Sequence, residues 1–134
     1  MSEENWNPLS VQGASTGFFF AGEDFRRSGL DLNQILLRRP SSTFFLQAAE
    51  DADLCGGIRY GDILVVDRAL EPDLVRGSLV VVLEGEKMLL RLLLRREGDL
   101  WLMSGQSGVV RISSESDLGV WGVVTYVLHP VDLR

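Results

Sequence analysis

The chain has 134 residues, which is the length of one domain with its own hydrophobic core. Its formal charge is −6, from 19 acidic and 13 basic side chains, and this balance argues against a DNA-binding face, which needs a concentrated positive field. Hydrophobic residues make up 46% of the chain, as in soluble globular proteins. The single cysteine, Cys55, excludes an internal disulfide and fits a reducing compartment. With an acidic N-terminus and no apolar run long enough to span a bilayer, we expect a cytoplasmic protein without membrane contact.

Residues 1–30 differ from the rest of the chain. They are rich in Gly, Ser and Asn, show no hydrophobic period, and carry the aromatic run Phe18, Phe19 and Phe20. This composition predicts a flexible, extended N-terminal arm. The aromatic side chains could dock onto a partner or cover an apolar patch of the same chain, and the sequence leaves both open.

A short helix is predicted directly after the arm, in LDLNQILLRRP. Asp31 is a suitable N-cap, with Gln34 three residues further on, and Pro40 follows the end of the segment. The remaining pattern, from Thr43 onward, is that of short β-branched or aliphatic runs separated by turn signals. These runs are TFFLQA, DILVVD, SLVVVLEG, KMLLRLLLR, DLWLM, VVRI and VWGVVTYVL.

Seven short strands at this spacing predict a mainly β domain over residues 31–134, either a compact sandwich or a partly closed barrel. The EGE tripeptide between two apolar runs predicts a hairpin. No nucleotide-binding or metal-binding motif is present, and His129 and Cys55 lie in different regions, so we expect no cofactor and no metal. His129 is predicted to be an ordinary surface residue, and Asp51 and Asp53 to be solvated turn formers.

Four segments carry a resemblance to a known family. They are DLNQILLRRPSSTFFLQA, DADLCGGIRYGDILVVDRAL, GSLVVVLEGEKMLLRLLL and ISSESDLGVWGVVTYVLHPV. From Gly17 to the C-terminus the chain resembles the UmuD/LexA-type self-cleaving Ser-Lys proteases of the bacterial SOS response, and UmuD most of all. The resemblance implies a LexA/UmuD-like curled β-sheet domain with one short helix, in a bacterial cytoplasm.

The family's catalytic dyad is a serine, in a Gly-Asp-Ser-Met loop, and a lysine on a neighbouring buried strand. The lysine acts as a base only when burial keeps its amine neutral. In the resemblance, Ala52 takes the place of the serine and Leu90 that of the lysine, so both catalytic groups are missing. The segment that resembles the active-site loop includes Asp51, Ala52, Asp53, Gly56 and Gly57.

None of the neighbouring side chains is a good substitute. Lys87 is three residues from Leu90 and should point to the opposite face of its strand, as should Arg91, whose guanidinium stays protonated. Cys55 has no histidine or lysine nearby in the sequence that would generate a thiolate. The resemblance therefore implies a pseudo-protease without catalytic residues.

The family cuts itself at a bond between a small residue and glycine, ahead of the helix. Alignment from DLNQ places this bond at Thr16-Gly17, and Ala21-Gly22 is an alternative. Without the dyad, this chain should be unable to remove its own arm.

The resemblance implies a catalytically inactive, UmuD-like protein of the DNA-damage response, a dimeric accessory or regulatory subunit of error-prone translesion synthesis. The implied partners are a second copy or a UmuD-like paralogue, a Y-family DNA polymerase and the recombinase filament, with no direct DNA binding. Two alternatives remain open. One is an active self-cleaving peptidase with relocated residues, and the other is a regulatory domain of a LexA-like repressor system.

Overall fold

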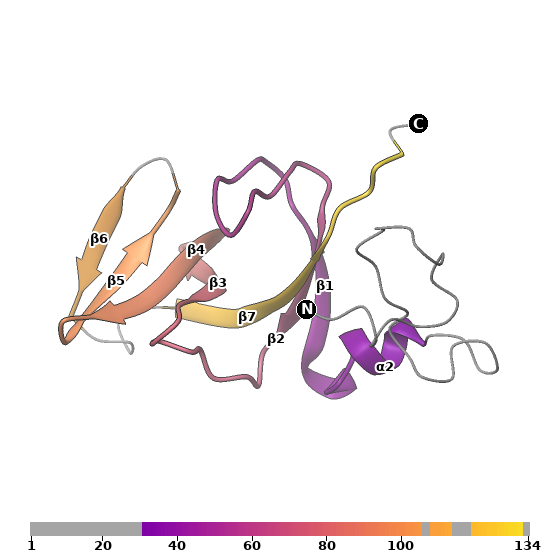
Figure 1. Ribbon diagram of the computed structural model, residues 1–134, viewed down its shortest axis with the longest axis horizontal. Coiled ribbons are helices and arrows are strands. Elements are labelled where there is room, and N and C mark those ends of the chain that lie inside the picture. Colours follow the sequence, from indigo (N-terminus) through magenta and orange to yellow (C-terminus); the bar gives the residue numbers. More distant parts are fainter. Residues whose placement is uncertain (1–30, 106–107, 114–118, 133–134) are drawn as a thin grey trace, which may run out of the picture. The chain divides into compact units, whose positions relative to one another are not determined.

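The computed structural model describes residues 31–105, 108–113 and 119–132 (Figure 1). The predicted arm over residues 1–30 lies outside this range, and with it both candidate cleavage bonds, Thr16-Gly17 and Ala21-Gly22. The chain divides into two compact units, residues 1–35 and 36–134. The elements are the α-helix α2 (Leu32–Leu36), the 3₁₀ helix η2 (Pro40–Ser42), and the strands β1 (Thr43–Gln47), β2 (Ile63–Asp67), β3 (Ser78–Glu84), β4 (Lys87–Arg96), β5 (Asp99–Met103), β6 (Val109–Ile112) and β7 (Gly119–Leu128).

Asp31 begins the short helix, as predicted. Its carboxylate Oδ1 accepts a hydrogen bond from the backbone N–H of Asn33 at 3.0 Å, and its carbonyl accepts one from the N–H of Gln34 at 3.1 Å. These two bonds satisfy N–H groups of the first turn that have no partner within the helix. The helix ends at Leu36, four residues before Pro40.

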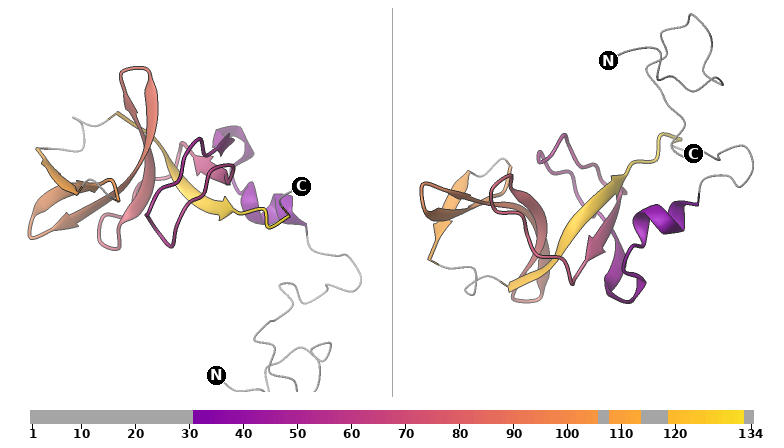
Figure 2. Two further views of the ribbon diagram at one scale, coloured as in Figure 1. Left: turned by 90° about the horizontal axis from the view of Figure 1, so that it is seen from above. Right: turned by 60° about the horizontal axis from the view of Figure 1, so that its bottom comes forward.

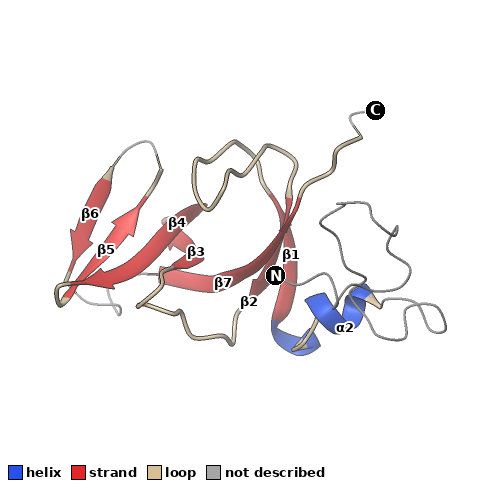
Figure 3. Ribbon diagram, viewed as in Figure 1, coloured by secondary structure: helices blue, strands red, loops and turns tan. Residues whose placement is uncertain are grey.

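The seven predicted strands are confirmed, and they form one sheet in the order β1-β2-β7-β3-β4-β5-β6 (Figure 3). All neighbouring strands are antiparallel. The EGE hairpin is also confirmed, because Glu84 pairs with Lys87 across a turn of Gly85 and Glu86. Since the described strands belong to a single sheet, the two-sheet sandwich is wrong, and the curled single sheet is the form that occurs (Figure 2).

Both faces of the sheet are buried at its centre. The first core cluster gathers on one face and consists of Ala48, Leu54, Ile58, Leu64, Val66, Leu79 and Val81. The second lies on the other face and consists of Val80, Val82, Leu93, Leu100 and Val123. This explains why β3 is an unbroken apolar run instead of an alternating one, since five successive residues of the strand are buried.

Two loops cover these clusters, and Figure 1 shows them on opposite sides of the sheet. Residues 48–62, between β1 and β2, contribute Leu54 and Ile58 to the first cluster. Residues 68–77, between β2 and β3, place Leu70 and Leu74 against the second. The loop over the first cluster is the one that contains Ala52, so the core of the domain supports it directly.

Asp67 fastens the start of β1 to the end of β2. Its side chain is buried and accepts hydrogen bonds from Arg39 Nη1, Ser42 Oγ and the Ala69 N–H, each at 2.8 Å. Burial alone would raise the pKa of Asp67, but the Arg39, Ala69 and Ser42 contacts outweigh it and the pKa is lowered below 3.8. The stabilisation from Asp67 is thus present above pH 3.8 and is lost as the pH falls through the lowered value.

Candidate functional site

The loop over residues 48–62 is held in shape by its own backbone. Ala52 and Ile58 exchange two hydrogen bonds, N–H to carbonyl in each direction, both at 2.8 Å. Between them the chain turns through three residues with positive φ, namely Cys55 at 48°, Gly56 at 88° and Gly57 at 100°. Glycine adopts this conformation without strain, which explains the Gly-Gly pair of the sequence.

The base of the loop is closed by further hydrogen bonds. The Ala48 N–H donates to the Asp62 carbonyl at 2.8 Å, and the Gly61 N–H donates to the Ala48 carbonyl at 2.8 Å. Across the loop, Asp51 Oδ1 accepts from the Tyr60 N–H at 2.7 Å. This contact agrees with the prediction of Asp51 as a turn former, because its carboxylate holds the backbone of the loop.

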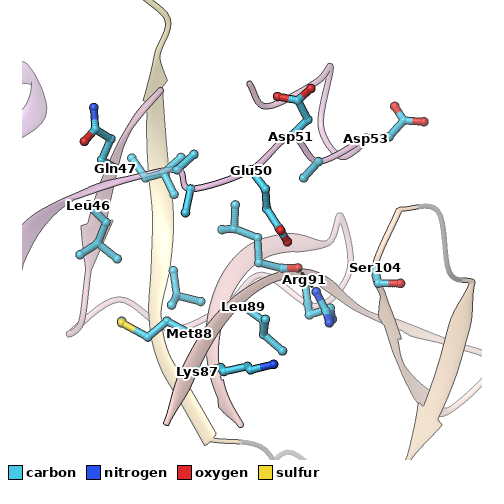
Figure 4. A pocket seen from close by; sticks show the side chains of 16 residues that line it. Leu46, Gln47, Glu50, Asp51, Asp53, Lys87, Met88, Leu89, Arg91 and Ser104 are labelled. Carbon is cyan, nitrogen blue, oxygen red and sulfur yellow. Dashed lines mark hydrogen bonds between the residues drawn. The ribbon is translucent and has the colours of Figure 1, made fainter. Parts of the chain in front are cut away.

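The tertiary structure brings Ala52 and Leu90 together. Leu90 pairs with Val81 in the β3–β4 hairpin, and both Ala52 and Leu90 pack against the first core cluster. The two residues line one pocket of about 720 Å³, which is shown in Figure 4. The pocket lies between the loop over residues 48–62 and strand β4. The residues that line it are Leu46–Asp53, Leu64, Val81, Lys87–Arg91 and Ser104.

Strand β4 shows the alternation that the sequence predicts. Leu90 and Leu92 pack against the first cluster, whereas Leu89 and Leu93 pack against the second. Lys87 shares the side of Leu89, and Figure 4 shows the Met88 side chain pointing away from it.

Arg91 has the same parity along β4 as Lys87. Its Nη1 donates a hydrogen bond to the Leu90 carbonyl at 2.6 Å, so its guanidinium is engaged by the strand itself. A guanidinium does not lose its proton in proteins and cannot serve as a general base. Both Arg91 and Lys87 also line the pocket.

Ser104 is a lining residue of the pocket that sequence reasoning missed. It follows β5, and the next residue, Gly105, lies so close to the loop that an added Cβ would come within 3.1 Å of the Asp53 carbonyl oxygen. In the sequence, SGQSG indicates only a turn. Its position beside the pocket depends on the pairing of β4 with β5, which aligns Leu92 with Met103.

His129 also has a role that was missed. Its side chain is half exposed, as predicted for a surface residue, but Nδ1 lies 2.6 Å from Oδ1 of Asp62, whose side chain is only 1% exposed. The Arg59 backbone N–H, which donates to Oδ2 at 3.0 Å, and then the His129 contact lower the pKa of Asp62 below 3.8. The stabilisation from Asp62 is therefore present above pH 3.8 and is lost as the pH falls through the lowered pKa.

At the two positions implied by the resemblance, the pocket is lined by aliphatic groups. Ala52 presents a methyl group and Leu90 an isobutyl group, and neither can attack a carbonyl or accept a proton. Cys55 is a free, exposed thiol on the same loop. Among the described residues, no three His, Cys, Asp or Glu side chains gather in a way that could hold a metal ion. None of the described helices has the length and apolar character needed to cross a membrane.

Comparisons with known proteins agree with this architecture. The family model described as "Peptidase S24-like" matches residues 9–125. The chain is 37% identical to Protein ImpA of Salmonella typhimurium over 123 residues, covering 91% of this chain and 83% of the relative. It is 37% identical to Protein MucA of Escherichia coli, with coverages of 95% and 88%, and 32% identical to Protein SamA of Salmonella typhimurium, with coverages of 91% and 84%. The chain therefore belongs to the Peptidase S24-like family of UmuD/LexA-type proteins.

Proposed function

We propose that this protein is a catalytically inactive member of its family that acts by binding, as a dimeric accessory or regulatory subunit in the bacterial response to DNA damage. The observation that carries the proposal is that Ala52 and Leu90 pack against the same core cluster and line the same pocket. If these two positions correspond to the family's serine and lysine, the scaffold is retained while both reactive groups are lost. What remains is a folded surface for partners.

Partly exposed apolar side chains on β1 and β7 support binding through the β-domain. Phe45 of β1 pairs with Val65 of β2, which pairs with Tyr126 of β7, so the three side chains share one face. Phe45 is 51% exposed and Tyr126 39%, and Leu128, two residues further along β7, is 38% exposed. Val65, between them, is fully buried, and partly exposed apolar side chains of this kind are enriched at protein interfaces.

The proposed partners follow from the family and from the charge of the chain. With a net charge of −6, the protein should contact other proteins and not DNA itself. A second copy or a UmuD-like paralogue would form the dimer, and a Y-family DNA polymerase or the recombinase filament would be its target in translesion synthesis. In a mixed dimer, an inactive subunit would hold an active paralogue's arm without cutting it.

Affinity purification tests the partner. A tagged chain, isolated from bacterial cells after DNA damage, should carry a Y-family polymerase or a UmuD-like paralogue in stoichiometric amount. A matched variant, Phe45→Ser with Tyr126→Ser, should recover at least about tenfold less, since truncating anchor side chains costs an interface about 2 kcal/mol or more. Recovery of a DNA-binding subunit in place of a polymerase would instead support the repressor alternative.

Mass spectrometry tests the absence of activity. Purified protein held at pH 9–10, where lysine and cysteine side chains begin to lose their protons, should keep its full mass, because neither Ala52 nor Leu90 can take part in cleavage. A time-dependent cut at Thr16-Gly17 or Ala21-Gly22 that disappears in Cys55→Ala would refute the proposal and favour an enzyme with a relocated nucleophile.

A further inference from the structure

Asp62 is a buried carboxylate whose partner comes from the far end of the chain. The residue follows the turn at the base of the loop over residues 48–62, and His129 lies 67 positions later, directly after β7. The Asp62 side chain is 1% exposed, whereas that of His129 is 52% exposed. The Asp62 carboxylate is therefore fixed in the protein interior, whereas the His129 side chain has room to move into solvent.

The carboxylate and the backbone of Asp62 are both used. Oδ2 accepts from the Arg59 N–H at 3.0 Å, and Oδ1 is 2.6 Å from His129 Nδ1. The Asp62 N–H donates to the Arg59 carbonyl at 3.0 Å, and its own carbonyl accepts from the Ala48 N–H at 2.8 Å. Through its backbone, Asp62 thus links the segment after β1 to the turn before β2. Its side chain links the same turn to the residue after β7.

We propose that His129 and Asp62 form a latch that fastens the segment after β7, residues 129–132, to the base of the loop over residues 48–62. If His129 is withdrawn, Oδ1 of Asp62 loses the partner from β7, and a buried carboxylate left short of donors destabilises the turn around it. The turn begins at Arg59, directly after Ile58 of the Ala52–Ile58 bridge, so we expect the loop to loosen with it.

Several charged groups lie on the elements that meet at the latch. The groups that act on Asp62 are Arg59, on the turn, and His129, on the segment after β7. Asp51 accepts from Tyr60 on the same turn, and Asp132 lies three residues beyond His129. A side chain that can donate to Asp62 Oδ1 is therefore needed at position 129, because a second acceptor there would face the buried carboxylate.

The latch couples two surfaces of the protein. A partner that binds residues 129–132 and draws His129 away would loosen the loop beside the pocket, and a ligand that rigidifies the loop would hold the segment in place, since such coupling is reciprocal. This inference holds whether or not the protein cleaves itself, because it concerns the shape of the loop and not a reaction.

Hydrogen exchange of the full-length protein tests the latch. In His129→Ala, the amides of Ala52, Ile58 and Gly61 should exchange about tenfold faster than in the unchanged protein, since a hydrogen bond to a charged group is lost. His129→Lys should return the rates to within about threefold of the original. Val131→Ala, on the same segment and 86% exposed, should leave them unchanged.

Two results would overturn the latch. One is an unchanged exchange rate at Ala52 and Ile58 in His129→Ala. The other is an equal acceleration at core amides such as Val66 and Val80, because His129 would then stabilise the whole domain and not the loop. A second variant, Asp62→Asn, removes the carboxylate. In this background, His129→Ala should no longer change the exchange rates of the loop amides, and a change that persists would also contradict the pairing.

Discussion

Restoring a hydroxyl and an amine together, in Ala52→Ser with Leu90→Lys, is expected to return self-cleavage to this protein. The product should be cut at Thr16-Gly17 or Ala21-Gly22 and should accumulate faster as the pH rises from about 7 to 10, the range in which a buried lysine loses its proton. The measurement is intact mass against time. The unchanged protein should show no cut under the same conditions.

The tertiary structure gives the physical reason. Positions 52 and 90 pack against the same cluster and line the same pocket, so groups placed there would start close to one another. Position 90 is half-buried among aliphatic side chains, which disfavours the charged form of an amine and supplies the neutral base that serine needs. Removing one member of such a pair typically costs about 100-fold or more in rate, so each single substitution should be nearly inactive.

A misplaced lysine is the matched control. Ala52→Ser with Leu89→Lys puts the same amine one residue away, on the face of β4 that packs against the second cluster. Leu89 also lines the pocket, but successive side chains of a strand point to opposite faces, so the amine should be misaligned with position 52 and the variant should cleave at least about 100-fold more slowly. Cleavage at an equal rate would show that an amine anywhere near the pocket suffices.

A reactive probe tests whether the serine in the pocket is activated, independently of whether the cleavage bond reaches it. A fluorophosphonate that labels activated serines should modify the first double variant at position 52 and not the Leu89→Lys control. A folded Ala52→Ser, Leu90→Lys protein that neither cuts itself nor takes the label would contradict the assignment of these positions to the family's dyad.

Gly122→Ala is expected to destabilise the domain by about 1–3 kcal/mol, a typical cost of overpacking a core. A Cβ at this position would lie 2.5 Å from Cγ1 of Val66, which is fully buried, and 3.4 Å from the Asp67 carbonyl oxygen. The side chain of Val66 is β-branched, which restricts the rotation that would relieve the contact. Urea unfolding should show a lower midpoint with an unchanged slope.

A double-mutant cycle identifies the cause of the Gly122 effect. Val66→Ala removes the methyl group that the new Cβ would meet, at the expense of a small cavity. In that background, Gly122→Ala should cost at least about 1 kcal/mol less than in the unchanged protein. Equal costs in both backgrounds would show that the close approach of Val66 is not the cause, and that the backbone of Asp67 limits the site.

Local sequence signals predicted the elements of this protein well. The seven strand runs, the EGE hairpin and the Asp31 helix start are all encoded in patterns of residues near in sequence, and all occur as expected. The family resemblance is likewise confirmed by the comparisons. The placement of Ala52 and Leu90 at one pocket was implied by that resemblance, whereas their assignment to a lost dyad remains a proposal.

Other features depended on long-range contacts and could not be read from the chain. Spacing alone did not distinguish one curled sheet from a sandwich, because the choice depends on which strands pair, and β7 joins β2 to β3 only in the folded sheet. The pairing of β4 with β5 set Ser104 beside the pocket.

His129 was predicted as a surface side chain because nothing near it in the sequence shows that Asp62, 67 residues earlier, is buried against it. The sequence by itself thus determined the strands, the turns and the residue types available for chemistry. Only the tertiary structure decided which of these residues come into contact. Strand pairing and side-chain burial join segments that are distant in sequence, and they arise only when the sheet forms with a core cluster on each face.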